Sequence, residues 1–209
     1  KTLVFPKRSM CGIFGSISDD AAAEVLEGLR KLEYRGYDSA GLAALFQDHE
    51  GPIETERTTG YVSDLVSKAN GRFRDARISI GHTRWATHGG VSDSNAHPHS
   101  SNDGKISIVH NGIIENASQL LQRVTKLGYE VTSETDSELI VHLLDHELKT
   151  QSTEKSPLDA FNSTVGLLKG SWALAVIMTG HDSIMVARNG APLIIGRGNM
   201  KICVSSDVL

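Results

Sequence analysis

The grouping of strand-like and helix-like segments is the feature of this sequence that most constrains its fold. Apolar or alternating runs, which are typical of strands, are found at 11–17, 42–46, 53–59, 77–81, 105–109, 172–178, 183–187, 193–195 and 201–205. Runs with apolar residues every three or four positions, which are typical of helices, are found at 22–34, 62–69, 116–127, 136–148 and 158–168. Because the two kinds do not strictly alternate, we expect one domain with an antiparallel or mixed sheet covered by helices.

Composition limits the class of protein. The 209 residues are 39% hydrophobic and 22% charged, which is enough apolar material for a sizeable core. The 21 basic and 25 acidic residues give a net charge of −4 without a basic block, so we expect no nucleic-acid partner. No apolar run has the length of a membrane span. Two cysteines make neither a disulfide framework nor a structural thiolate zinc site, and we expect a cytoplasmic enzyme with a small-molecule substrate.

The two ends of the sequence predict a segment before the domain and a truncation after it. The chain starts with a lysine, its first methionine is Met10, and Cys11 follows directly. We therefore expect residues 1–10 to be a leader or an added segment, and residues 11–209 to be the domain. The strand predicted at 201–205 ends four residues before the last one, so we expect the domain to be truncated at its C-terminus.

Cys11 is a candidate nucleophile. If Met10 starts translation and is removed, Cys11 acquires a free α-amine with a pKa of about 8 beside a thiol with a pKa of about 8.5. The amine can then serve as the base for the thiol. The alternatives are a buried, unreactive cysteine, which is the role we assign to Cys203, and a papain-like pair of Cys11 with His110. The residues alone leave these interpretations open.

The segment from His82 to Gly89 carries side chains suited to binding an anion. Arg84 can hold a carboxylate through two hydrogen bonds, with neighbouring hydroxyls completing the contact. The simpler interpretation is an exposed strand end on which Trp85 is partly packed. Five histidines between 82 and 110 suggest a metal, but none has the spacing of zinc ligands on one helix, so we expect no metal and no cofactor.

Two further motifs have both a chemical and a structural interpretation. His110-Asn111-Gly112 ends a predicted strand, where an Asn amide and a Gly N–H are suitable donors for an oxyanion hole. An Asn-Gly pair is also the commonest hairpin turn. Asp136 precedes an apolar run, so its default role is to cap a helix, although its carboxylate could instead bind an ammonium group.

In combination and in this order, these segments resemble a known family. Met10-Cys11-Gly12-Ile13-Phe14-Gly15 resembles the start of class II glutamine amidotransferases, which are N-terminal-nucleophile hydrolases. The family's other blocks follow in order at 35–41, 82–89, 95–99, 110–116 and 133–136. The Tyr-Asp-Ser-Ala-Gly, Arg-Trp-Ala-Thr-His-Gly and Ala-His-Pro-His forms are similar to those of the glucosamine-6-phosphate synthase branch. The resemblance covers nearly all of residues 10–209.

The resemblance implies an α+β fold, a four-layer αββα sandwich with two antiparallel sheets, and the chemistry of a glutaminase. The Cys11 thiolate would attack the side-chain amide of L-glutamine, and the Cys11 α-amine would relay the proton. Asn111 and the Gly112 N–H would stabilise the oxyanion. Ammonia would leave, and water would hydrolyse the remaining thioester to glutamate.

The resemblance also implies how the substrate is held. Arg84, Thr87 and His88 would bind the carboxylate of glutamine, and Asp136 would bind its α-ammonium. Trp85 and the loop after it would close over the substrate and exclude water. These contacts would select a free amino acid, since a protein-bound glutamine carries neither charge.

Supporting residues and partners are implied in the same way. Arg35 would help to order the nucleophile end, and His97 would have a structural or interdomain role. The synthases of this branch carry sugar-phosphate isomerase domains after the glutaminase, so we expect such domains downstream in the same polypeptide, and a homodimer. Two alternatives remain open: an amidotransferase that feeds another acceptor, and a non-catalytic module that senses glutamine.

Overall fold

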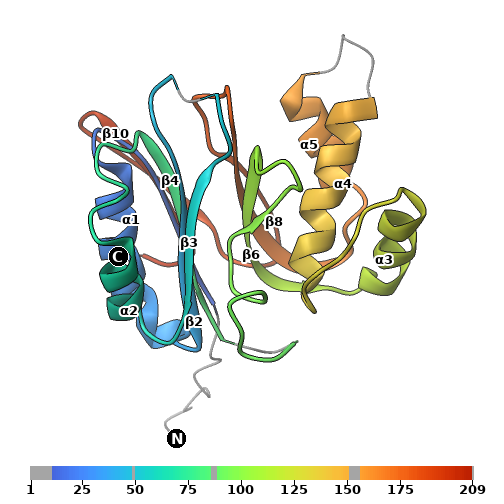
Figure 1. The fold of residues 1–209 in the computed structure, drawn as a ribbon, viewed down its shortest axis with the longest axis horizontal. Coiled ribbons are helices and arrows are strands. Elements are labelled where there is room, and N and C mark those ends of the chain that lie inside the picture. The colour runs from blue at the N-terminus through green and yellow to red at the C-terminus, as the bar shows by residue number, and fades with distance from the viewer. Residues whose placement is uncertain (1–10, 49, 86–88, 151–155, 209) are drawn as a thin grey trace, which may run out of the picture.

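The computed structural model describes residues 11–48, 50–85, 89–150 and 156–208, whose strands form two sheets (Figure 1). The larger sheet has six strands in the order β3-β2-β4-β1-β10-β9, and the smaller has four in the order β5-β6-β7-β8. All of these pairings are antiparallel. The strands are β1 (Gly12–Ile17), β2 (Ser39–Leu45), β3 (Glu54–Thr59), β4 (Ile78–Arg84), β5 (His99–Ser100), β6 (Ile106–Ile114), β7 (Gly170–Met178), β8 (Met185–Asn189), β9 (Ile194–Gly198) and β10 (Lys201–Ser205).

The helices cover the outer faces of the two sheets. Those on the six-stranded sheet are α1 (Ala21–Leu32) and α2 (Val62–Ala69), with the 3-10 turn η1 (Glu33–Arg35) after α1. Those on the four-stranded sheet are α3 (Ala117–Lys126), α4 (Asp136–Thr150) and α5 (Pro157–Val165). Figure 1 shows the resulting order of layers, helix, sheet, sheet, helix, and the predicted αββα sandwich is confirmed. In the described part of the chain, no helix has both the length and the apolar character that crossing a membrane requires.

Alternation along the strands builds these layers. Successive residues of a strand face opposite sides of the sheet, so in β1 Ile13 is buried between the two sheets while Phe14 packs under α1. The layer between the sheets consists mainly of alanine and β-branched residues, which allow the sheets to approach closely. It includes Ile13, Ala43, Ile80, Val109, Ala173, Ala175 and Ile177.

Local sequence signals account for several helix boundaries. Helix α5 begins with Pro157, and the Ser156 side chain accepts a hydrogen bond from the Asp159 N–H at 3.2 Å, completing a capping box. Helix α2 ends at Ala69, and Asn70 caps it with a φ of 41°, in the left-handed region that Asn tolerates. The Asn70 cap explains why this helix stops where the predicted range 62–69 ends.

Two strands continue further than the sequence patterns predict. Strand β4 extends through Arg84, and β6 extends through Asn111 and Gly112 to Ile114. The interpretation of Asn111-Gly112 as a hairpin turn is therefore wrong. Both residues pair with β7, Gly112 opposite Trp172, and the partner strand overrides the local turn preference. Between the strands predicted at 77–81 and 105–109, the structure also contains the short strand β5, which pairs with β6.

Truncating a side chain should lower the free energy of unfolding most where that side chain is buried between the sheets. Ile80 is fully buried, so Ile80→Ala should lower the free energy of unfolding by about 2–5 kcal/mol. The same change at Ile195, which is 63% exposed on β9, should cost about 1 kcal/mol or less. Urea denaturation of both variants measures the difference, and equal losses would contradict the packing of the two sheets.

Candidate active site

Cys11 lies immediately before β1, at the end of the six-stranded sheet where β4 finishes. Gly12 is paired with Thr83, which brings the Cys11 thiol beside the residue that follows β4. There the backbone N–H of Trp85 donates to Cys11 Sγ at 3.3 Å. A Cβ on Gly12 would lie 2.6 Å from Thr83 Oγ1, so this approach requires glycine. Burial raises the pKa of the Cys11 thiol, which therefore needs a base before it can act as a nucleophile.

The four-stranded sheet contributes Asn111 and Gly112 to the same place. Asn111 Nδ2 donates to the backbone carbonyl of Cys11 at 2.9 Å. Gly112 has a φ of 114°, and a Cβ there would lie 2.1 Å from the carbonyl oxygen of Ser171. A residue with a Cβ would fit this position only if β7 moved. The position therefore requires glycine more strictly than a hairpin turn would.

Arg84 is the last residue of β4 and is 4% exposed. It shares the inner face of β4 with Ile80, because the two residues are four positions apart on one strand. Its Nη1 donates to the carbonyl of Gly90 at 3.1 Å. Burial lowers the pKa of the guanidinium below its ordinary value, yet an arginine stays charged at neutral pH. Thr87 and His88, predicted to bind the same carboxylate, lie outside the described residues.

Asp136 is the first residue of α4, and its carboxylate faces β6. Oδ2 accepts a hydrogen bond from the N–H of Ile114 at 2.8 Å, and Oδ1 lies 3.6 Å from His110 Nδ1. The side chain thus ties the start of α4 to β6. Because it is 19% exposed, the carboxylate can still reach a bound ligand.

One small cavity joins these groups. Its lining comes from five segments: Cys11, Arg84, Trp85, His97, His110, Gly112, Thr135, Asp136 and Ser137. A guanidinium and a carboxylate in one cavity can bind the two charges of a free amino acid, with a thiol beside them. Of the predicted site residues that the structure describes, six line this cavity; Asn111 and Arg35 reach it through the backbone of Cys11.

Arg35 and Trp85 surround the nucleophile. Arg35 Nε donates to the carbonyl of Cys11 at 3.3 Å, and its guanidinium pairs with Asp207 beyond β10. The ring of Trp85 packs edge-on against Tyr37 with 5.3 Å between the centroids. Cys11 is therefore held by contacts from both η1 and the end of β4.

A cluster of buried histidines adjoins the cavity, and two of its members, His97 and His110, line it. The ring of His97 is 4.1 Å from that of His82 and 4.7 Å from that of His99. Burial lowers the pKa of His82 and of His99 to about 3, and it also lowers those of His97 and His110. These rings are therefore neutral at physiological pH. Among the residues that the structure describes, no group of three or more His, Cys, Asp or Glu side chains could hold a metal ion.

The papain-like pairing of Cys11 with His110 is not formed. His110 Nδ1 lies 2.8 Å from Ser137 Oγ, and its Nε2 has no hydrogen-bond partner in the described part of the chain. His97 Nε2 lies 2.8 Å from the same hydroxyl. His110 is thus engaged with the start of α4, and it is not bonded to the thiol.

Sequence reasoning missed a contact that holds the loop beside Arg84. Asn95 Nδ2 donates to Glu134 Oε2 at 2.9 Å, and Asn95 Oδ1 accepts from the Glu134 N–H at 2.9 Å. Glu134 also accepts from the Gly90 N–H at 2.9 Å, a bond that lowers the pKa of this carboxyl. The segment containing Gly90 and Asn95 is thereby fixed against the residues before α4.

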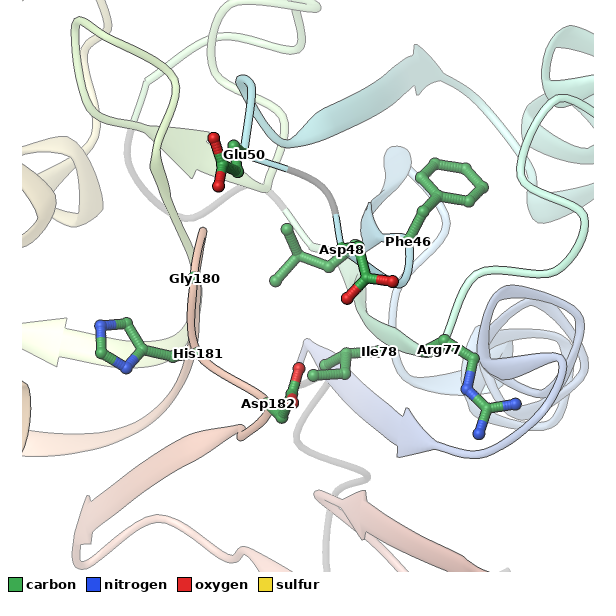
Figure 2. A pocket seen from close by; sticks show the side chains of 9 residues that line it. Phe46, Asp48, Glu50, Arg77, Ile78, Gly180, His181 and Asp182 are labelled. Carbon is green, nitrogen blue, oxygen red and sulfur yellow. The ribbon is translucent and has the colours of Figure 1, made fainter.

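A separate pocket lies at the opposite end of β4. Figure 2 shows the carboxylates of Asp48 and Asp182 beside Ile78, with the Arg77 side chain extending away from them. Arg77 pairs instead with Asp19. None of the site residues predicted from the sequence lines this pocket, so the chemistry of Cys11 is not located there.

Comparison with known proteins places this site in a family. The family model described as a glutamine amidotransferase domain matches residues 82–208. This chain belongs to the glutamine amidotransferase domain family. The predicted membership of the class II glutamine amidotransferases, and with it an enzymatic role, is confirmed.

Curated relatives of this amidotransferase domain are named glutamine–fructose-6-phosphate aminotransferase [isomerizing]. The relative from Pseudomonas aeruginosa is 47% identical over 202 residues, which are 96% of this chain and 32% of the relative. The relative from Pyrococcus horikoshii is 44% identical over 201 residues, which are 95% of this chain and 33% of the relative. The chain therefore spans about a third of the length of the curated relatives it matches.

A solved structure agrees with this assignment. Glutamine phosphoribosylpyrophosphate amidotransferase from B. subtilis, complexed with ADP and GMP, matches with a TM-score of 0.77 and 26% identity. The match covers 94% of this chain and 42% of that one. The N-terminal-nucleophile hydrolase fold predicted for the amidotransferase domain is confirmed.

The buried, neutral histidines should make the folded amidotransferase domain less stable as the pH falls. His82 and His99 have a pKa of about 3 when folded and an ordinary value of 6.5, so between these values the unfolded chain binds more protons. The free energy of unfolding should therefore fall from about pH 7.5 to about pH 5.5, by up to about 1.4 kcal/mol per pH unit for each histidine. Urea denaturation at both pH values measures this. His99→Gln, which cannot titrate, should show a smaller fall; equal stability of the unaltered domain at both pH values would refute the effect.

Proposed function

We propose that the amidotransferase domain hydrolyses L-glutamine to glutamate and ammonia through a thioester on Cys11. The observation that carries this proposal is the single cavity in which the Cys11 thiol lies with the buried cation of Arg84 and the carboxylate of Asp136. Family membership supports glutamine as the substrate. Asn111, bonded to the carbonyl of Cys11, supplies an amide donor beside the nucleophile.

Two opposite charges would hold the backbone of free glutamine. Arg84 binds the α-carboxylate, together with Thr87 and His88, and Asp136 binds the α-ammonium. Both charged groups are already oriented by backbone contacts, Arg84 by the Gly90 carbonyl and Asp136 by the Ile114 N–H. A glutamine inside a polypeptide has neither charge and would leave both groups unpaired in the cavity, so the site selects the free amino acid.

The first chemical step needs a base, because burial raises the pKa of the Cys11 thiol. With Cys11 as the first residue, its α-amine takes the thiol proton while sulfur attacks the amide carbon. The oxyanion of the tetrahedral intermediate accepts hydrogen bonds from Asn111 Nδ2 and the Gly112 N–H. In other enzymes, one hydrogen-bond donor of this kind stabilises the transition state by about 3–4 kcal/mol.

The remaining steps return the enzyme to its starting state. The protonated α-amine gives its proton to the leaving nitrogen, the carbon–nitrogen bond breaks, and ammonia departs. Water then attacks the thioester while the amine of Cys11 accepts its proton, and the same two donors stabilise the second oxyanion. The carbon–sulfur bond breaks, the amine returns a proton to sulfur, and glutamate is released.

The surrounding residues position this chemistry. Arg35 orders the nucleophile through the carbonyl of Cys11, and Trp85 with the loop after it closes over glutamine to exclude water. His97 has a structural role, supported by its burial and by its contact with Ser137.

The longer protein is proposed to use the ammonia on a sugar phosphate. The curated relatives named glutamine–fructose-6-phosphate aminotransferase [isomerizing] extend far beyond the third that this chain matches. By this relationship, residues 11–209 form the glutaminase domain, residues 1–10 precede it, and isomerase domains follow. The product would be glucosamine 6-phosphate, made by a cytoplasmic homodimer.

The amino terminus of Cys11 gives the sharpest test of this mechanism. A preparation whose first residue is Cys11 should release glutamate from glutamine. The same protein with residues 1–10 attached should turn over at least about 100-fold more slowly, because an amide nitrogen cannot act as a general base. Glutamate release measures the activity, and intact mass verifies the first residue of each preparation.

Replacing the second cysteine, Cys203, tests whether the activity depends on Cys11 alone. Cys203→Ala in the protein that starts at Cys11 should keep full activity, since Cys203 contacts Ser16 and Glu24 and does not line the cavity. Full activity with residues 1–10 attached would rule out the amine as the base. No glutamate release from either preparation would rule out the glutaminase itself.

A further inference from the structure

His82 makes a contact between the two sheets that the proposed chemistry has not used. Its Nε2 lies 3.0 Å from Asn111 Oδ1 and 2.9 Å from the backbone carbonyl of His110. Both partners are oxygen acceptors, so Nε2 must carry the proton and donate to both. The ring is 1% exposed, and its other nitrogen, Nδ1, has no hydrogen-bond partner among the residues that the structure describes. Within the described part of the chain, the side-chain hydrogen bonds of His82 are therefore directed at β6.

Together with the contact to the Cys11 carbonyl, the bond from His82 fixes which way the side-chain amide of Asn111 faces. An Asn amide has a donor end and an acceptor end, and rotating it by about 180° exchanges them. In the structure Oδ1 faces His82 and Nδ2 faces the carbonyl of Cys11. After such a rotation, Oδ1 would face the Cys11 carbonyl and Nδ2 would face the N–H of His82. Both contacts would then be repulsive.

We infer that His82 is a positioning residue, which holds the Asn111 amide with its donor end toward the reacting centre. Among the described residues, His82 is the side chain that donates to Asn111 Oδ1. An oxyanion at the carbon attacked by Cys11 would be stabilised by Nδ2 and repelled by Oδ1. This inference rests on the proposed glutaminase function, and it assigns to His82 a role that acts only through Asn111.

The buried position of His82 suits this role better than an exposed position would. It lies on the inner face of β4, in register with Gly41 and Ile13 of the neighbouring strands, where burial shields its N–H from solvent. Burial also keeps the ring neutral, with a pKa of about 3, so one tautomer donates throughout the physiological pH range. The donor is thus fixed in both position and protonation state.

A purely structural role is the competing explanation, because the bond to the His110 carbonyl also links the two sheets. Two substitutions of nearly equal size separate the roles. In His82→Gln the side-chain Nε2 can replace the imidazole Nε2 as donor, whereas His82→Met has no donor. Both variants are made in the protein that starts at Cys11, and urea denaturation establishes that each is folded. If the Met variant does not fold, His82→Leu replaces it.

The kinetic comparison uses glutamate release over a range of glutamine concentrations. His82→Met should lower kcat by at least about 10-fold with KM within about 3-fold of the original, because the lost contact matters in the transition state. His82→Gln, which keeps a donor, should have a kcat much closer to that of the unaltered protein. Equal kcat values for the two variants, or a loss confined to KM, would overturn the inference.

A double-mutant cycle with Asn111→Ala then tests whether His82 acts through Asn111. In that background, His82→Met should change kcat by less than about 2-fold, since no amide remains to be oriented. The same 10-fold loss in both backgrounds would show an independent structural role and overturn the inference. A failure of the proposed function looks different, because then the unaltered protein that starts at Cys11 would release no glutamate.

Discussion

The pairing of β1 with β4 is the contact on which the site depends. Its register sets Gly12 against Thr83, so the residue before β1 and the residues at the end of β4 must meet. The same register buries Ile13 between the sheets, and a slip by one residue would turn every side chain of β1 to the opposite face. The geometry around Cys11 is therefore maintained by the same packing that stabilises the sandwich.

Packing of the two sheets brings the remaining groups to this point. The inner faces of β4 and β6 meet where His82 contacts Asn111, and the outer face of β6 meets Asp136 at the start of α4. Burial then sets the chemistry, since it raises the pKa of the Cys11 thiol and keeps the nearby histidines neutral. Under the proposed mechanism, the thiol depends on a base, which its own α-amine supplies when Cys11 is the first residue.

Much of the fold could be predicted from local patterns, because hydrophobic periodicity and caps are local. The helix at 62–69 and the strand at 201–205 were predicted with their observed bounds. The continuation of β6 through Asn111 and Gly112 could not be, since the pairing with β7 that enforces it is distant in sequence. The clamp of Asn95 on Glu134 and the tautomer of His82 depend on similar long-range contacts. The motif resemblance selected most site residues, but their mutual hydrogen bonds required the three-dimensional structure.

The central claim is that the Cys11 thiol is the nucleophile of a glutamine-binding cavity. Its most direct test is covalent labelling of the protein that starts at Cys11 with a diazoketone analogue of glutamine, followed by peptide mass spectrometry. The account predicts a single adduct on Cys11, no adduct on Cys203, and protection by excess glutamine. Labelling of Cys203, or labelling of Cys11 that glutamine does not prevent, would contradict it.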